Sequence, residues 1–322
     1  MLDEKSRRVF SSKALNYFDE LTKNMSYTKT AQLLGITQPA LTQQIKKIER
    51  VVGAPLFYSV GKKIYLTDAG TSLLKATHQM FDLINNVTDH IQQASSEKSG
   101  TISIGLLSTA ESIVIEDFIV EYNRINPNVV IDLNLLTRKE LWDNIQNNQI
   151  DMAIMYLPDK NIKSWKIYKS KKIISDNIML IHNNEKFSKR ESVCYKDAIS
   201  KPWATYLKTY YFSELLRERL RDALVDDPQV VARFSSPYQL LKFAQESEDV
   251  YTVLPLSFCI AHQSMFKLYQ TPLEPAISSD LSFVYREDKE KIPRIQEFLS
   301  EWDNFLDKVS YIDRLKSSRK IL

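Results

Sequence analysis

The stretch Thr37-Gln38-Pro39-Ala40-Leu41-Thr42-Gln43-Gln44 decides the fold, because it joins a strong helix start to a run of polar side chains. Thr37 is a good N-cap, since its hydroxyl can accept an N–H of the first turn. Pro39 lies in that turn, where its missing N–H costs nothing. The glutamines and Thr42 offer uncharged donors and acceptors of the kind that read base edges. The stretch therefore predicts a helix that enters a DNA groove.

Basic residues follow this predicted recognition helix at two places. Lys46, Lys47 and Arg50 continue the helix and are placed for the phosphate backbone. Gly61-Lys62-Lys63 is typical of the tip of a two-stranded wing, with Gly for the turn and two cations for phosphate. The residues that we expect to contact DNA are Thr28, Thr37, Gln38, Pro39, Thr42, Gln43, Lys46, Lys47, Lys62 and Lys63.

The segments before the recognition helix favour a helix-turn-helix. Residues 28–34 predict a short helix, and Gly35 follows where a helix ends in the left-handed conformation. Leu15, Phe18 and Leu21 fall at three-residue spacing and predict the apolar stripe of a first helix. Three short helices with a Gly turn between the second and third describe the DNA-binding motif. The alternative is a generic helical hairpin with polar caps.

A long helix is predicted from Thr67-Asp68 to about residue 93. Apolar or small residues recur in it at alternating spacings of four and three, which is a heptad seam. They are Leu73, Thr77, Met80, Ile84, Val87 and Ile91. The length favours a linker helix that pairs with a second copy of the chain; the alternative is an amphipathic helix packed on its own domain.

Five colinear segments of this N-terminal region match one known signature. They are Ala14-Leu15-Asn16-Tyr17-Phe18, Ser26-Tyr27-Thr28-Lys29-Thr30-Ala31, Thr37-Gln38-Pro39-Ala40-Leu41-Thr42, Gly53-Ala54-Pro55-Leu56-Phe57 and Leu66-Thr67-Asp68-Ala69-Gly70. Together they resemble LysR-type transcriptional regulators. The resemblance implies a winged helix-turn-helix, a linker-helix dimer, and a C-terminal effector-binding domain shaped like a periplasmic binding protein. It also implies that two dimers form a tetramer through the C-terminal domains.

Two positions depart from the pattern of that family. Ser59 stands where an Arg is usual at the wing, so wing contacts with DNA must rest on Lys62 and Lys63. Met25 stands where a Gly is common, just before the Ser that opens the second helix. Neither change removes the fold, but we expect the first to weaken or re-aim the wing contacts.

Charge and glycine are unevenly distributed along the 322 residues. Residues 1–95 carry 12 Lys+Arg and 8 Asp+Glu, a net of +4, whereas the remainder carries 31 and 32, a net of −1. The positive balance lies on the side that must bind duplex DNA. All six glycines lie within the first 105 residues, which excludes a glycine-rich phosphate loop beyond them.

Several protein classes are disfavoured by the sequence. It has no apolar run of about twenty residues and no signal-peptide pattern at its charged N-terminus, so we expect a cytoplasmic protein without a membrane partner. Cys194 and Cys259 lack metal-ligand or CxxC spacing, the four histidines are scattered, and no catalytic motif occurs. We therefore expect that the protein binds no metal and no cofactor and that it is not an enzyme. The alternative function is a cytosolic small-molecule-binding protein or an enzyme on an α/β scaffold.

The pattern changes after a polar, hinge-like stretch at residues 94–100. Strands and helices then alternate, which is typical of a parallel sheet with helices on its faces. The expected strands are 101–106, 129–136, 151–157, 173–182, 230–234, 250–254 and 281–286. The expected helices are 111–125, 139–147, 212–224, 238–246, 256–264 and 292–308.

The predicted fold class is therefore α/β, with an N-terminal winged helix-turn-helix, a long linker helix and a two-lobed α/β domain. The DNA-binding domain takes residues 1–67, the linker helix 68–94 and the effector-binding domain 95–322. We expect lobe I to comprise about 101–164 and 272–308, and lobe II about 165–271.

Ligands bind such sheets at the carboxyl ends of strands, beside helix N-termini. Ser108-Thr109 directly follows the first expected strand and is predicted to open the next helix, where hydroxyls and N–H groups hold an anion. The resemblance places the effector between the lobes and matches this pair to the usual polar pair there. Plain N-caps are the alternative. The expected effector-binding residues are Ser108, Thr109, Thr137, Arg138, Thr205 and Ser236.

Three further side chains leave alternatives open. Arg138 either pairs with a ligand carboxylate or is a solvated surface charge. Tyr206 and Tyr251 either line the cleft or belong to the core.

The sequence as a whole predicts a sequence-specific transcriptional regulator modulated by a small anionic metabolite. Its expected partners are double-stranded promoter or operator DNA, the effector, a second copy in a homodimer, a tetramer of such dimers, and RNA polymerase.

Overall fold

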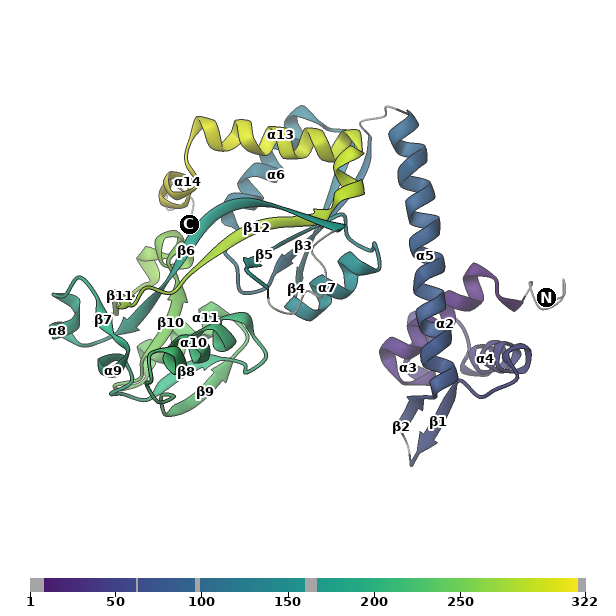
Figure 1. The fold of residues 1–322 in the computed structure, drawn as a ribbon, viewed down its shortest axis with the longest axis horizontal. Helices are drawn as coiled ribbons and strands as arrows, with labels where there is room; N and C mark the ends of the chain where they lie inside the picture. The colour runs from purple at the N-terminus through teal and green to yellow at the C-terminus, as the bar shows by residue number, and fades with distance from the viewer. Residues whose placement is uncertain (1–8, 62, 96–98, 160–166, 318–322) are drawn as a thin grey trace. The chain divides into compact units, whose positions relative to one another are not determined.

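The computed structural model describes residues 9–61, 63–95, 99–159 and 167–317. Contacts divide the chain into two compact units, residues 1–88 and 89–322. Each unit has its own hydrophobic core. The division falls inside the long helix α5 (Asp68–Ser95), drawn in blue in Figure 1. None of the described helices has the length and apolar character that crossing a bilayer requires.

Three helices in the described part of the first unit are each started by a hydroxyl side chain. They are α2 (Ser12–Asn24), α3 (Tyr27–Leu33) and α4 (Gln38–Val52). The capping residues Ser11, Ser26 and Thr37 each accept an N–H of the first turn. The predicted helix-turn-helix and its Thr37 cap are therefore present.

Two turns between these helices take the left-handed backbone conformation. Gly35 has a φ of 65° between α3 and α4, which glycine adopts without a steric penalty. Met25 ends α2 with a φ of 46°, and its N–H donates to the Leu21 carbonyl. The position where a Gly is common in the resembling family is thus left-handed here too, with a larger side chain.

The wing and the start of α5 are fixed to each other by short-range contacts. Strands β1 (Phe57–Val60) and β2 (Lys63–Leu66) pair antiparallel around Gly61, as predicted. A Cβ on Gly70, in the first turn of α5, would lie 2.2 Å from the Leu56 carbonyl oxygen. Only glycine permits this close approach, so the angle at which α5 leaves the wing depends on it.

Helix α5 divides into a part packed on its own unit and an exposed part. His78 Nε2 lies 2.8 Å from Oδ1 of Asp19 on α2, and Thr77 is buried. Further along, Leu83, Ile84 and Val87 are 63%, 48% and 52% exposed. The first part of the helix thus follows the alternative of packing on its own domain, and pairing of the exposed part with a second copy stays a prediction. The side chain of Ile91 lies outside the described part of the chain.

The second unit opens with the predicted β-α-β-α-β order. Its elements are β3 (Gly100–Leu107), α6 (Ile113–Ile125), β4 (Val129–Leu136), α7 (Arg138–Gln146) and β5 (Met152–Leu157). Strand β3 pairs parallel with β4 on one side and β5 on the other. The parallel arrangement places the ends of β3 and β4 together at one edge of the sheet, beside the start of α7.

The whole sheet is mixed rather than parallel, which corrects the sequence-based expectation. Strands β6 (Tyr168–His182) and β12 (Ser278–Arg286) pair antiparallel with each other, and β12 pairs antiparallel with β5. The sheet continues beyond β6 with β11 (Tyr269–Glu274) and β7 (Val193–Cys194), so the strand order is β4-β3-β5-β12-β6-β11-β7. Figure 1 shows β6 and β12 as two long ribbons that cross the second unit together. A chain that leaves lobe I and returns to it must reverse direction, so these strands cannot be parallel.

Strand β6 changes partners near its middle, and a buried carboxylate marks this point. Residues 168–177 pair with β12, whereas residues 178–182 pair with β10 (Thr252–Pro255) and β11 (Tyr269–Glu274). Asp176 accepts hydrogen bonds from the Tyr156 hydroxyl at 2.8 Å and from the Ser257 hydroxyl at 2.6 Å. Burial raises the pKa of Asp176, and the hydrogen bonds donated to it partly oppose that rise.

Lobe II contains elements that the sequence patterns did not indicate. Strand β8 (Trp203–Tyr206) pairs parallel with the predicted β9 (Val230–Phe234), and β11 was also missed. Four residues give little periodicity, and Pro272 within β11 argues against a strand. The remaining α-helices and the short strand of the second unit are α8 (Glu185–Ser188), β7 (Val193–Cys194), α9 (Tyr195–Ala198), α10 (Tyr211–Asp222), α11 (Pro237–Glu246), α12 (Leu256–Ala261), α13 (Pro293–Lys308) and α14 (Tyr311–Ser317).

Candidate functional site

Helix α4 has one buried face and one face that carries the candidate DNA-contacting side chains. Leu41, Ile45 and Ile48 are fully buried in the core of the first unit. On the other side the predicted residues are exposed, except for Thr42, which is half-buried. The exposed ones are Thr37, Gln38, Pro39, Gln43, Lys46 and Lys47. Burial of the apolar stripe therefore directs the glutamines and lysines outward.

Two of the predicted base readers are bonded to each other. Gln38 Nε2 donates to Thr42 Oγ1 at 3.0 Å, one helical turn away. This bond orders both side chains and leaves the Gln38 amide oxygen and the Thr42 hydroxyl proton for another partner. Gln43 is exposed beside this pair.

The wing lies at the end of α4 because a carboxylate joins the two. Glu49 Oε1 accepts the Leu56 N–H at 2.8 Å, just before β1. Lys63 is exposed on β2, Ser59 is exposed on β1, and Thr28 is exposed on α3. Lys62 lies outside the described residues. The cation that the structure describes at the wing is thus Lys63, on a hairpin whose Tyr58 and Tyr65 rings stack at 5.6 Å.

A second candidate site lies in the second unit, where the ends of β3 and β4 meet lobe II. A cavity of about 250 Å³ is lined by Leu107, Ser108, Thr109, Thr137, Arg138, Lys139, Thr209, Tyr210 and Tyr211. We call it the inter-lobe cleft. It brings together four of the six predicted effector-binding residues, although they come from two separate strand–helix junctions.

Ser108 and Thr109 do not open a helix, which corrects one expectation. They lie in a turn after β3, where the Ser108 N–H donates to the Leu136 carbonyl at 2.9 Å. Helix α6 begins only at Ile113, and Glu111 Oε1 accepts the N–H groups of Ser112 and Ile113. The chain thus supplies its own carboxylate to this helix start, so the α6 dipole cannot be what attracts a ligand.

Arg138 is neither solvated nor free for a simple ion pair with a ligand. Its Nε donates to Asp159 Oδ2 at 2.7 Å, and its Nη2 donates to the Tyr156 carbonyl at 3.2 Å. The guanidinium lies 4.1 Å from the ring centre of Tyr211. The side chains of Arg138 and Asp159 are 10% and 1% exposed. Asp159 therefore offsets much of the positive charge of Arg138 and fixes its position.

Two polar atoms of the cleft are buried without a partner among the described residues. They are the Ser108 hydroxyl and Arg138 Nη1. A buried polar group without a hydrogen bond is costly, by roughly 1–3 kcal/mol. Both side chains line the same cavity, so one acceptor-rich molecule in the cleft can satisfy both.

Thr137 is the N-cap of α7, which is the alternative to a ligand-binding role that the sequence left open. It forms a capping box with Glu140, whose carboxylate accepts both the N–H and the hydroxyl of Thr137. Thr137 lines the cleft, yet its hydroxyl proton is already donated to Glu140 at 2.7 Å. As it stands, this hydroxyl can only accept a hydrogen bond from a ligand.

The other sequence-predicted residues lie away from the cleft. Thr205 is buried, and its hydroxyl donates to the Tyr206 carbonyl at 3.1 Å. Ser236 precedes α11 and makes no side-chain cap. Tyr206 and Tyr251 are 2% and 1% exposed and belong to the core. These tyrosines follow the core alternative, because Tyr206 on β8 and Tyr251 just before β10 both lie inside lobe II.

Sequence reasoning missed the lobe II side of the cleft. Thr209, Tyr210 and Tyr211 line it at the start of α10, and burial raises the pKa of the Tyr211 hydroxyl. The Asp159–Arg138 pair was also missed, because 21 residues separate its members. The sequence did contain a signal for this side of the cleft. Tyr210 and Tyr211 come directly before the helix predicted from residue 212, and the resemblance implied a cleft between the lobes.

Comparison with known proteins agrees with both units. Residues 12–71 match the bacterial regulatory helix-turn-helix protein, lysR family, and residues 95–303 match the LysR substrate binding domain. The regulator CbbR of Rhodospirillum rubrum is 31% identical over 147 residues, 45% of this chain and 48% of that protein. The activator CmpR of Synechocystis sp. is 28% identical over 145 residues, 45% and 47% of the two chains. In these matches the chain spans about half the length of each curated relative.

A solved structure supports the arrangement of the fold. Full-length CbnR complexed with its target DNA has a TM-score of 0.62 and 14% identity, and the match covers 92% of this chain and 100% of that chain. At this identity the likeness carries the fold alone.

Asp159→Asn should strongly destabilise the second unit, because it leaves the Arg138 charge buried and unpaired. We expect the free energy of unfolding to fall by about 3 kcal/mol. Asp197→Asn is the matched control, since its pair with Arg190 is 48% and 42% exposed and should contribute less than about 1 kcal/mol. Urea unfolding monitored by tryptophan fluorescence measures both. Equal losses in the two variants would show that Asp159 does not hold Arg138.

Proposed function

Because the chain belongs to the bacterial LysR family, we propose that it is a sequence-specific transcriptional regulator that responds to a small anionic metabolite. One of the two family descriptions names a bacterial regulatory helix-turn-helix protein, and the other names a substrate binding domain. The observation that carries the proposal is the division of α4 into an apolar core face and an exposed face of glutamines and lysines. A regulator of promoters acts where chromosomal DNA is, so the proposal places the chain in the cytoplasm.

The DNA contacts separate into base reading and phosphate binding. Gln43 and the bonded pair of Gln38 and Thr42 offer amide and hydroxyl groups to base edges. Lys46, Lys47 and the wing lysines bind the backbone, which is independent of sequence. Ser59 adds no charge at the wing, so we assign a smaller share of the affinity to the wing than an Arg there would give.

Gln43→Ala should weaken binding to the specific operator by roughly 1–3 kcal/mol, since a base contact is lost, while affinity for random duplex stays the same. Lys63→Ala should weaken binding to both duplexes and flatten the salt dependence. Lys242→Ala, which removes an exposed lysine of α11 in the other unit, is the charge control. Fluorescence anisotropy at several salt concentrations measures all of these. Parallel losses on both duplexes for Gln43→Ala would contradict its role in reading bases.

Operator binding in this proposal needs two copies of the chain, paired through α5. The exposed Leu83, Ile84 and Val87 form an apolar surface on the part of this helix beyond its own core. A second α5 covers such a surface in a coiled-coil pair. Two dimers forming a tetramer through the second units, and contact with RNA polymerase, extend the same proposal.

Ile84→Asp should dissociate the dimer and abolish operator binding, because it places a charge in the seam. Gln79→Asp adds the same charge to an exposed polar position of α5 and should leave the dimer intact. Sedimentation velocity reads the oligomer directly. A dimer of unchanged stability in Ile84→Asp would rule out α5 as the interface.

The effector of this proposal binds in the inter-lobe cleft. Arg138 Nη1 and the Ser108 hydroxyl both lack partners there, and a carboxylate or similar group accepts from both. Lys139 adds an exposed cation, so the lining favours an anion. Residues of both lobes line the cleft, hence a ligand that prefers one inter-lobe arrangement shifts the population toward it.

Ser108→Ala should remove ligand binding without a loss of stability. The hydroxyl is buried and unsatisfied in the ligand-free chain, so its deletion leaves the free energy of unfolding unchanged or raises it by about 1 kcal/mol. Native mass spectrometry of protein purified from its own host should detect a bound small molecule in the wild type and none in the variant. Ser188→Ala, an exposed serine of α8, is the control. Undiminished retention by Ser108→Ala would place the effector elsewhere.

A further inference from the structure

A separate pocket lies wholly within lobe II, between α10 and β9. It has a volume of about 300 Å³, at the lower end of the range for small-molecule sites. Its lining residues are Thr205, Tyr206, Lys208, Ser213, Leu216, Arg217, Leu220, Asp227, Pro228, Val230 and Arg233. We call it the α10–β9 pocket. It shares no lining residue with the inter-lobe cleft.

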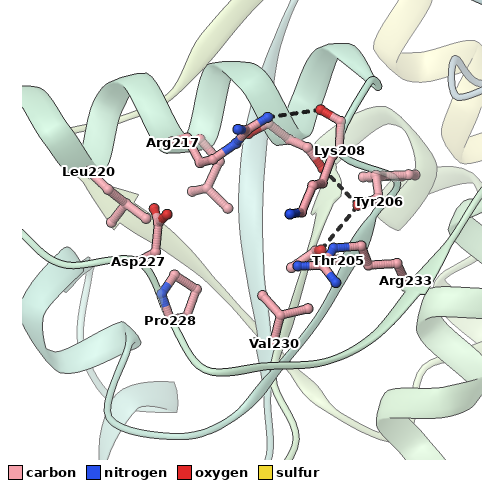
Figure 2. Close-up of a pocket in the computed structure, with 11 residues that line it drawn as sticks. Thr205, Tyr206, Lys208, Arg217, Leu220, Asp227, Pro228, Val230 and Arg233 are labelled. Atoms are coloured by element: carbon pink, nitrogen blue, oxygen red, sulfur yellow. Dashed lines mark hydrogen bonds between the residues drawn. The ribbon is translucent and has the colours of Figure 1, made fainter.

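Three cations and one carboxylate converge on this pocket. Figure 2 shows Lys208 and Arg233 reaching into the space from one side and Asp227 lying on the other. None of the three cations forms an ion pair within the described part of the chain. Two other cations of lobe II do form ion pairs, Lys201 with Asp249 at 2.7 Å and Arg190 with Asp197 at 2.7 Å. The pocket therefore has an excess of positive charge, because its lining holds three cations against the single carboxylate of Asp227.

One of these cations is held in place by the backbone. Arg217 Nε donates to the Ser213 carbonyl at 3.2 Å. Its Nη2 donates to the Lys208 carbonyl at 2.8 Å, as Figure 2 shows. The guanidinium thus spans α10 and the turn before it, with its remaining donors still available. A donor group that is already ordered loses less entropy when a ligand binds.

The walls of the pocket are also fixed. The hydroxyls of Thr205 and Ser213 both donate to the Tyr206 carbonyl, at 3.1 Å and 2.9 Å, which ties the end of β8 to α10. Leu216 and Leu220 are buried and supply an apolar base. A preformed concave site with an apolar base and a few convergent charges is the usual form of a small-ligand site.

We infer that the α10–β9 pocket binds a small organic polyanion, bearing phosphate or carboxylate groups, at a second site of the second unit. Lys208 in the turn before α10, Arg233 on β9 and Arg217 on α10 bind the acidic groups of this anion. Lys208 lines this pocket, and the next residue, Thr209, lines the inter-lobe cleft. A ligand in either site therefore contacts the same turn. If one ligand changes the affinity for the other, the second changes the affinity for the first by the same factor. The inference stands whether or not the effector binds in the cleft.

The test uses the full chain and two probes, inorganic pyrophosphate and succinate, titrated separately by isothermal calorimetry. Binding of either supports the pocket, and which one binds identifies the acidic group. The double variant Lys208→Gln/Arg233→Gln should weaken binding about tenfold, because two partly exposed charge contacts are lost. Lys242→Gln removes a charge from the same lobe outside the pocket and should bind as the wild type does.

Arg138→Gln separates this pocket from the inter-lobe cleft. Under the inference it leaves the affinity for the probe unchanged, whereas a probe held in the cleft loses affinity in Arg138→Gln and not in the double variant. That second pattern overturns the inference, as does an absence of binding by either probe. Matching thermal midpoints of the double variant and wild type exclude a loss of binding through unfolding.

Discussion

Asp176 connects the parts of the second unit on which the rest of its structure depends. It lies on β6 where that strand exchanges β12 for β10 and β11 as partners. Its carboxylate accepts from Tyr156 of β5 and from Ser257 at the start of α12, so the sheet of lobe I, the crossing strand and lobe II meet at one buried group. A buried carboxylate is tolerated only when it is hydrogen-bonded, and these bonds fix where the two lobes diverge.

Each unit of the chain presents polar groups by burying apolar ones beneath them. In the first unit, Leu41, Ile45 and Ile48 fill the core and leave the glutamines of α4 outside. In the second, the Tyr211 ring packs under the Arg138 guanidinium while Asp159 holds its Nε. Both arrangements limit side-chain motion before a partner arrives, which lowers the entropy cost of binding.

The turn between β8 and α10 is where the two candidate anion sites of the second unit come closest in sequence. Lys208 faces the α10–β9 pocket, while Thr209 to Tyr211 face the inter-lobe cleft. Arg217 binds the Lys208 carbonyl from α10, so movement of the helix moves the turn. A short segment shared by two sites is a physical route by which one ligand alters the affinity for another.

The sequence by itself determined the features that depend on neighbouring residues. The Thr37 cap, the left-handed turn at Gly35 and the alternating strands and helices of lobe I follow from local sterics and hydrogen bonding. Tertiary structure alone decided what depends on distant partners. It held Ser108 in a turn through the Leu136 carbonyl, paired Arg138 with Asp159 and made the sheet mixed. Such contacts join residues far apart in the chain, and no local pattern encodes which distant group will fill a given position.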